Sequence, residues 1–150
     1  MKNNFIKSLL FIPGHKKNFL ENLKYMNSDA LAIDLEDAVP INQKKQARKN
    51  LESLNVKNYK NKLYVRLNND TINLVADIKS SLKVKINSFI LPKINSAKDI
   101  KIIQKLIKRY SKSKNLKFMI LIESAKAIIN LKEICETSKN INGLIFGAED

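Results

Sequence analysis

Charged side chains stand at the ends of several short apolar runs in this chain. The charged residues that follow or end such a run are Asp34, Glu36, Asp37, Arg66, Lys93, Glu123, Glu149 and Asp150. Carboxylates can move protons or hold a hard divalent cation, and a guanidinium can bind a carboxylate through two parallel hydrogen bonds. These residue types can therefore perform chemistry together, provided that the fold brings the ends of the runs to one place.

The apolar runs alternate with helical patterns along the whole chain. The strand-like runs cover residues 8–14, 30–37, 62–68, 88–93, 117–124 and 143–150. Amphipathic helical spacing follows at residues 18–26, 41–54, 71–82, 96–111 and 125–138. Strict alternation predicts parallel strands joined by helical crossovers. The runs are almost fully apolar, as strands covered on both faces should be.

Parallel strands deliver their ends to a single edge of the sheet. We therefore expect the charged groups named above to gather at the carboxyl edge, where parallel α/β folds bind ligands. The opposite ends of the runs are mostly Asn, Lys and Ser. The carboxyl edge is thus the predicted site of function.

Two α/β architectures fit this pattern, an open doubly wound sheet and a (β/α)8 barrel. The loop after the first run, "IPGHKKN", has one glycine and lacks the G-x-G-x-x-G phosphate loop of dinucleotide-binding sheets. A barrel needs eight strands and about 250 residues. Six strand-like runs within 150 residues predict an incomplete barrel, with residues 1–150 as one partial (β/α) barrel domain.

The composition limits the partners of the chain. The net charge is +14, but the lysines are spread over the presumed helix faces and the aromatic residues lie inside apolar runs. A base-stacking surface needs lysines and aromatic residues interleaved. Solvated helix faces therefore explain the positive net charge better than a nucleic-acid-binding surface does. A basic nucleic-acid-binding module stays open as an alternative. It would need a contiguous basic face and binding that weakens steeply with salt.

Two further features concern the compartment. The single cysteine, Cys135, lies among apolar neighbours in a helical pattern, which predicts a buried residue in a reducing compartment. No apolar run approaches the roughly 20 residues of a membrane-spanning helix. We therefore expect a cytoplasmic protein without a membrane partner.

The strand ends also resemble a known family. The segments "KSLLFIPG", "AIDLEDAVP", "VRLN", "ILPKINSA", "LIESA" and "GLIFGAED" occur in this order. Together they resemble the HpcH/HpaI aldolase/citrate lyase family, which includes citrate lyase beta subunits and malyl-CoA lyases. The resemblance extends over essentially the whole chain. It implies a (β/α)8 TIM barrel that uses Mg2+ and cleaves or forms a carbon–carbon bond beside a CoA thioester.

The resemblance assigns roles to individual residues. It implies that Glu123 and Asp150 are the metal ligands, with Glu123 also beside the substrate. Arg66 matches a substrate-binding arginine, and Glu36 matches a catalytic carboxylate that reaches toward the substrate or the metal-bound waters. Glu149 is expected to be structural.

The remaining polar residues of these motifs receive weaker assignments. Asp34 and Asp37 are expected to orient the loop that carries Glu36. Gly14 would let the first loop approach the phosphates of CoA. The other polar residues of that loop are expected to be bystanders or surface groups: His15, Lys16 and Lys17.

The leading hypothesis is therefore the N-terminal part of a Mg2+-dependent lyase for citryl-CoA, malyl-CoA or a related 3-hydroxyacyl-CoA. A pyruvate-type class II aldolase without CoA and a truncated pseudo-enzyme that only binds partners remain alternatives. The resemblance implies a homo-oligomer, trimeric or hexameric, with a CoA-thioester substrate and no nucleic acid. It also implies two further strands and a lid beyond residue 150. The 150-residue fragment alone is expected to be inactive.

Overall fold

A computed structural model of the chain describes residues 5–59, 62–113 and 115–147. Six strands form the sheet: β1 (Leu9–Pro13), β2 (Ala30–Asp34), β3 (Leu63–Arg66), β4 (Ser88–Leu91), β5 (Lys117–Ile122) and β6 (Ile141–Phe146). The α-helices are α1 (Lys17–Glu21), α2 (Lys44–Glu52), α3 (Thr71–Lys83), α4 (Ala97–Tyr110), α5 (Ala125–Ile129) and α6 (Leu131–Glu136). Three 3-10 segments join them: η1 (Leu23–Tyr25), η2 (Ile41–Gln43) and η3 (Val56–Tyr59).

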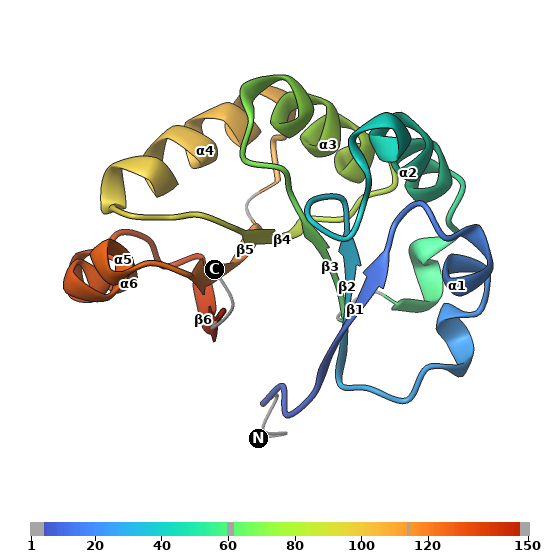
Figure 1. Cartoon of the computed structure of the whole chain (residues 1–150), viewed down its shortest axis with the longest axis horizontal. Helices are drawn as coiled ribbons and strands as arrows, with labels where there is room; N and C mark the ends of the chain where they lie inside the picture. The colour runs from blue at the N-terminus through green and yellow to red at the C-terminus, as the bar shows by residue number, and fades with distance from the viewer. Residues whose placement is uncertain (1–4, 60–61, 114, 148–150) are drawn as a thin grey trace.

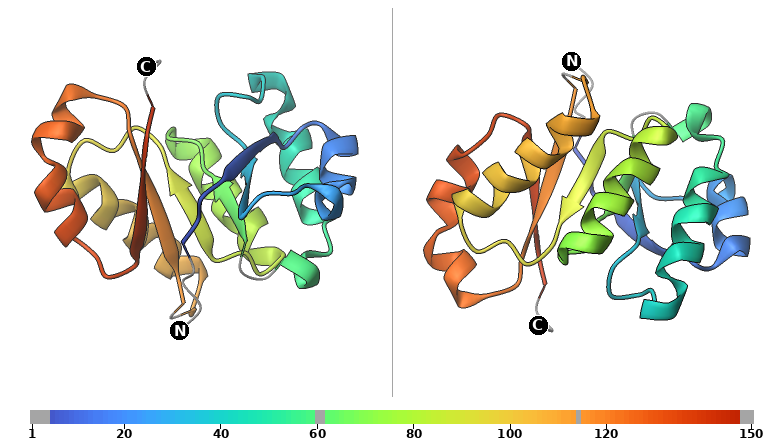
Figure 2. Two further views of the ribbon diagram at one scale, coloured as in Figure 1. Left: turned by 90° about the horizontal axis from the view of Figure 1, so that it is seen from below. Right: turned by 90° about the horizontal axis from the view of Figure 1, so that it is seen from above.

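The strands lie in the order β1-β2-β3-β4-β5-β6, and every neighbouring pair is parallel. The sheet curves, and the helices line its outer side (Figure 1). Both views in Figure 2 show the helices on this one side. The predicted alternation of six strands with helices is confirmed as a half-barrel. The complete eight-stranded barrel remains a prediction.

Side chains alternate between the two faces of the sheet, as the period of a β-strand requires. The outward apolar residues pack under the helices, among them Leu31, Ile33, Leu63, Val65, Phe89, Leu91, Phe118 and Ile120. The inward residues form a second cluster of Ala30, Ala32, Tyr64, Ile90, Met119 and Leu121. Continuing the alternation by one step puts Asp34 and Arg66 on the inner side, directly above Ala32 and Tyr64.

Three local predictions need correction. The helix expected over 125–138 is broken at Asn130, whose side chain donates to the carbonyl of Asn95 instead of continuing a regular helical surface. The helix expected over 18–26 is divided into α1 and η1. Cys135 is exposed, because α6 turns its neighbour Ile134 into the core. In the described ranges, no helix combines the length and apolarity needed to cross a bilayer.

Candidate functional site

The carboxyl edge of the sheet holds an ion pair between neighbouring strands. Asp34 ends β2 and is in register with Arg66, which ends β3. Arg66 Nε donates to Asp34 Oδ1 at 2.9 Å, and Nη2 donates to Oδ2 at 2.5 Å. The guanidinium also lies over the ring of Phe11 from β1, with Cζ 5.1 Å from the ring centroid. The edge of the guanidinium that carries Nε and Nη2 is therefore occupied by Asp34.

Asp34 organises the loop that follows its own strand. Its carboxylate is fully buried and also accepts the backbone N–H of Glu36 at 2.8 Å and of Ala38 at 3.1 Å. Each carboxylate oxygen of Asp34 thus accepts one hydrogen bond from a backbone N–H and one from the Arg66 guanidinium. This supports the predicted orienting role of Asp34.

Glu36 is the buried acid of the site. Glu36 is only 4% exposed, and its Oε2 has no hydrogen-bond partner among the described residues. The nearest cations are Arg66, with Nη1 3.5 Å from Oε2, and Lys93, with Nζ 3.4 Å from Oε1. Burial, and next the adjacent charge of Asp37, raise the pKa of Glu36 to about 7, although both cations oppose the change. A carboxyl with this pKa can take up and release a proton near neutral pH.

Two buried side chains hold the backbone beside Glu36. Lys44, at the start of α2, donates Nζ to the carbonyls of Leu35 at 2.8 Å and Glu36 at 2.5 Å. Asn68 Nδ2 donates to the same Leu35 carbonyl at 2.6 Å. Burial lowers the pKa of Lys44. Neither residue was assigned a role from the sequence, because both act on backbone carbonyls that lie 8 to 33 residues away along the chain.

A second buried ion pair supports Asn68. Asp77 of α3 is fully buried and accepts from Asn68 Nδ2 at 2.7 Å and from the Asn68 backbone N–H at 2.9 Å. Its other oxygen accepts from Arg48 Nη1 at 3.0 Å. The loop that carries Glu36 is thus fixed to α2 and α3. Such fully hydrogen-bonded polar networks rigidify a site.

Glu123 lies at the same edge, after β5. Its Oε2 accepts the backbone N–H of Lys93 at 2.9 Å. The next strand passes close by, because the Gly147 N–H donates to the Ile122 carbonyl at 3.0 Å. A Cβ atom at Gly147 would stand 2.9 Å from Glu123 Cγ. A larger residue at position 147 would therefore displace the Glu123 side chain.

The predicted partner of Glu123 cannot be placed. Asp150 and Glu149 lie outside the described residues, so the expected proximity of Glu123 and Asp150 stays a prediction. Within residues 5–59, 62–113 and 115–147, no three His, Cys, Asp or Glu side chains gather in a possible metal-binding group. Mg2+ needs only one or two protein carboxylates, since it keeps several waters. The hard oxygens of Glu123 and Oε2 of Glu36, which accepts no hydrogen bond among the described residues, fit the surroundings of such an ion.

The first loop is pinned against β2. The Gly14 N–H donates to the Asp34 carbonyl at 2.8 Å, and a Cβ at Gly14 would lie 2.9 Å from that oxygen. Asn50 Nδ2 donates to the carbonyls of Gly14 at 3.0 Å and His15 at 3.1 Å. Close packing thus explains Gly14 without a ligand. Burial, with a smaller effect from Lys16, lowers the pKa of His15.

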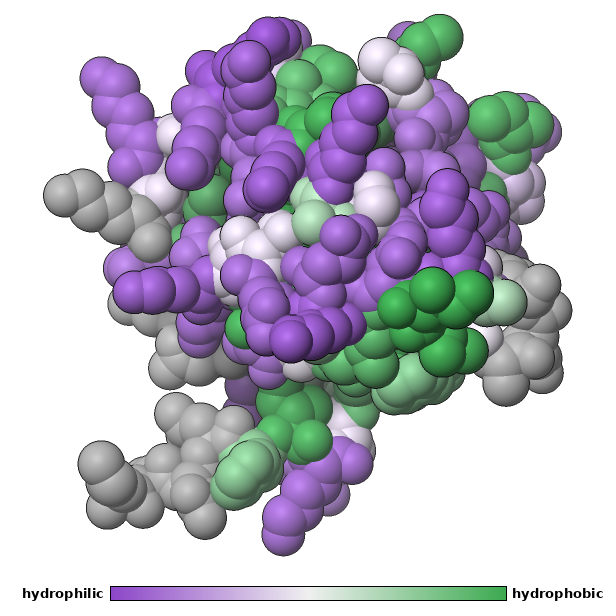
Figure 3. All heavy atoms as spheres, turned by 90° about the vertical axis from the view of Figure 1, so that its left-hand side faces the viewer, coloured by the Kyte–Doolittle hydropathy of each residue, from purple (hydrophilic) through white to green (hydrophobic). Residues whose placement is uncertain are grey.

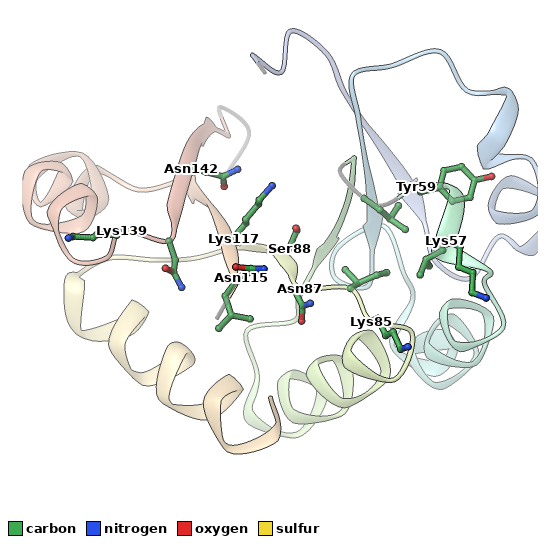
Figure 4. A pocket seen from close by; sticks show the side chains of 14 residues that line it. Lys57, Tyr59, Lys85, Asn87, Ser88, Asn115, Lys117, Lys139 and Asn142 are labelled. Atoms are coloured by element: carbon green, nitrogen blue, oxygen red, sulfur yellow. The ribbon is translucent and has the colours of Figure 1, made fainter. Parts of the chain in front are cut away.

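A hollow of about 730 Å3 lies at the opposite, amino-terminal edge of the sheet. Figure 4 shows the lysines and amides of its rim spread over several elements. Its lysines among the described residues are Lys57, Lys85, Lys117 and Lys139, and all four are exposed. None of the described lining residues is an acid, a thiol or a histidine, so this part of the hollow offers less chemistry than the carboxyl edge.

Comparisons with known proteins identify the family of the chain. The sequence model of the HpcH/HpaI aldolase/citrate lyase family matches residues 7–150. A (3S)-malyl-CoA thioesterase of Cereibacter sphaeroides is 30% identical over 147 residues, which are 96% of this chain and 49% of that protein. The citrate lyase subunit beta of Leuconostoc mesenteroides is 31% identical over 152 residues, 96% of this chain and 50% of that protein.

A further relative and a solved structure extend the comparison. The L-malyl-CoA/beta-methylmalyl-CoA lyase of C. sphaeroides is 30% identical over 151 residues, 94% of this chain and 48% of that protein. The citrate lyase beta subunit of Mycobacterium tuberculosis, solved with oxaloacetate and magnesium, has a TM-score of 0.80 at 22% identity. The similarity covers 99% of this chain and 61% of that structure, and it supports the fold. The chain spans about half the length of these curated relatives.

Proposed function

The chain belongs to the HpcH/HpaI aldolase/citrate lyase family, and we propose that it carries the N-terminal part of a Mg2+-dependent carbon–carbon lyase. The proposed substrate is the CoA thioester of a 3-hydroxy acid, of the citryl-CoA or malyl-CoA type. One observation supports this most directly. A buried glutamate with a pKa of about 7 lies between Arg66 and Lys93, at the sheet edge that also carries Glu123.

In net terms the reaction breaks the C2–C3 bond and moves one proton from the 3-hydroxyl group to C2. The 3-hydroxyl group loses its proton, the C2–C3 bond breaks, and the products are a thioester enolate and a 2-oxo acid, which is a keto acid from citryl-CoA and an aldehyde acid from malyl-CoA. The enolate then takes up a proton at C2 to give the shorter acyl-CoA. We assign the hydroxyl proton to Glu36, whose Oε2 accepts no hydrogen bond among the described residues and can accept this proton near neutral pH.

Arg66 is assigned to the carboxylate of the oxo-acid half. Its Nε and Nη2 already bind Asp34, so the proposed contact uses the end that carries Nη1. Glu123 and Asp150 would hold Mg2+, which when bound polarises the reacting oxygen and offsets negative charge on it. Phe11 and Asp34 keep the guanidinium in place before the substrate arrives, which lowers the entropic cost of binding.

A second function at the same site is thioester hydrolysis. It is favoured by one finding, the 30% identity to the (3S)-malyl-CoA thioesterase, which equals the identity to the malyl-CoA lyase. In hydrolysis the thioester C–S bond breaks and CoA leaves as a free thiol. The pyruvate-type aldolase without CoA would instead accept substrates that lack the thioester.

The products distinguish these functions. The full-length protein is incubated with Mg2+ and with citryl-CoA or malyl-CoA, and the released oxo acid and free thiol are measured separately. Oxo acid without free thiol supports the lyase, whereas free thiol without oxo acid supports the thioesterase. Turnover of free hydroxy-keto acids, with none of either thioester, would contradict both CoA-dependent functions.

The assembly of the protein is part of the proposal. By family resemblance we infer a homo-oligomer in which a lid from one subunit completes the site of another. Closing such a lid would exclude water from the enolate. Sedimentation velocity of the protein checks this, with a trimer or hexamer as the expected species.

A further inference from the structure

Two lysines have the left-handed backbone conformation that favours glycine. Among the described residues, Lys85 (φ 63°) and Lys93 (φ 55°) are the only residues other than glycine with positive φ. This conformation is sterically unfavourable for a residue with a Cβ atom. The cost needs an explanation at each position.

Lys85 is explained by the end of a helix. Its N–H donates to the Leu82 carbonyl at 3.0 Å, and the Ile86 N–H donates to the Ser81 carbonyl at 3.0 Å. These two bonds form a Schellman motif, whose residue after the cap is normally left-handed. Lys85 lies at the amino-terminal edge of the sheet, away from Glu36.

Lys93 has no helix end to explain it, because it comes two residues after β4. Its backbone N–H donates to Glu123 Oε2 at 2.9 Å. Its ammonium lies 3.4 Å from Glu36 Oε1 and 3.8 Å from Asp37 Oδ1. One residue therefore contacts acids from the loop after β2 and from the end of β5. With this backbone conformation, the amide of Lys93 points to Glu123 and its side chain to Glu36.

We propose that Lys93 is a positioning residue of the proposed lyase site, which orients Glu123 through its backbone amide and holds Glu36 through its ammonium. This proposal rests on the proposed function for its catalytic consequence. Strained backbone persists only where the surrounding structure fixes it, and it concentrates at functional sites.

A hydrogen-bonded clamp fixes the strained segment. Asn95 Nδ2 donates to the Lys93 carbonyl at 3.3 Å, and Ser124 Oγ donates to Asn95 Oδ1. Asn130 Nδ2 donates to the Asn95 carbonyl at 2.8 Å. Ser124 follows Glu123 directly, so the clamp joins the loop of Lys93 to the end of β5 that carries the proposed metal ligand.

The charges around Glu36 indicate what the ammonium does there. Asp37 faces Glu36 from the same loop, Arg66 from β3 and Lys93 from the loop after β4. Lys93 is thus the second cation that favours the ionised form of a carboxylate whose burial disfavours it. Without it, Glu36 should hold its proton to higher pH and lose its fixed orientation.

The test uses Lys93→Asn with Lys85→Asn as the matched control. Asn tolerates the left-handed conformation, so both variants should keep or raise the unfolding temperature. The pKa of Glu36, followed by carboxyl 13C NMR, should rise by about one unit in Lys93→Asn, as expected for the loss of a nearby opposite charge. It should not move in Lys85→Asn. Lys93→Gly serves as a second variant if Lys93→Asn folds poorly.

Turnover provides the second measurement. With the preferred thioester, kcat/KM should fall about tenfold or more in Lys93→Asn, and the rising limb of its pH profile should move to higher pH. An unchanged Glu36 titration in both Lys93 variants would overturn the proposal, whatever the activity. A shifted titration in a protein that turns over no thioester would support the positioning role and count against the proposed function.

Discussion

At the scale of single residues, Glu36 should make stability depend on pH. Its folded pKa of about 7 lies above its ordinary value of 4.5. The folded state therefore binds the proton more tightly than the unfolded chain does. The resulting stability is fully present below pH 4.5 and is lost as the pH rises through about 7.

Glu36→Gln should remove this loss, because a neutral amide carries no charge to bury. We expect the variant to be more stable than the wild type at pH 8 by about 2 kcal/mol, with the difference vanishing below pH 4.5. Urea unfolding across this pH range measures it. In Asp37→Asn the free energy of unfolding should fall at a lower pH than in the wild type, since the Asp37 charge raises the Glu36 pKa. A Glu36→Gln variant with the same pH dependence as the wild type would contradict the assignment.

Arg66→Lys should reduce both turnover and stability. Lysine keeps the charge but loses the fork that binds the fully buried Asp34. We expect kcat/KM to fall about 100-fold and the free energy of unfolding to fall by about 1–3 kcal/mol. The sequence alone does not predict the effect on stability, because the pairing of Arg66 with Asp34 depends on strand register.

Arg48→Lys is the matched control for Arg66→Lys. Arg48 also pairs with a fully buried aspartate, Asp77, but it lies on α2 away from the inner edge. It should lose comparable stability and much less turnover. Equal losses of turnover in both variants would show that Arg66 acts only through the fold.

At the scale of elements, strand order and the carboxyl edge could be predicted, while individual helix ends could not. Alternating apolar runs predicted six parallel strands because local patterning determines this fold class. The break at Asn130 depends on a hydrogen bond to Asn95, 35 residues away. The left-handed backbone of Lys93 depends on Glu123 and Asn95, and lysine itself gives no signal for it.

The Schellman motif after α3 offers a test at this scale. Lys85→Gly should raise the free energy of unfolding by about 0.5–1 kcal/mol, because glycine adopts positive φ without a Cβ penalty. Thermal or urea unfolding measures the gain. Lys83→Gly is the control, since Lys83 is the last helical residue of α3 and should lose stability. A destabilised Lys85→Gly would show that the lysine side chain stabilises this turn.

At the scale of the whole molecule, the half-barrel formed by the described residues has two open edges. Within the described residues, β1 pairs only with β2, and β6 pairs only with β5. Apolar side chains are exposed on these strands, Leu10 at 43% and Phe146 at 65%. Figure 3 shows a hydrophobic patch, coloured green, on a face that is otherwise mostly hydrophilic. Unpaired apolar edges invite association with other chains.

Residues 1–150 expressed alone should therefore self-associate and show no measurable lyase activity. Sedimentation velocity measures the association, and release of oxo acid from malyl-CoA or citryl-CoA measures the activity. Leu10→Lys should reduce the association, because a charge on an edge strand opposes pairing. Ile72→Lys, at an equally apolar but 84% exposed position on α3, should leave it unchanged. Robust turnover by a monomer of these residues would show that six strand ends suffice for catalysis, because neither a closed barrel nor a lid would then be needed.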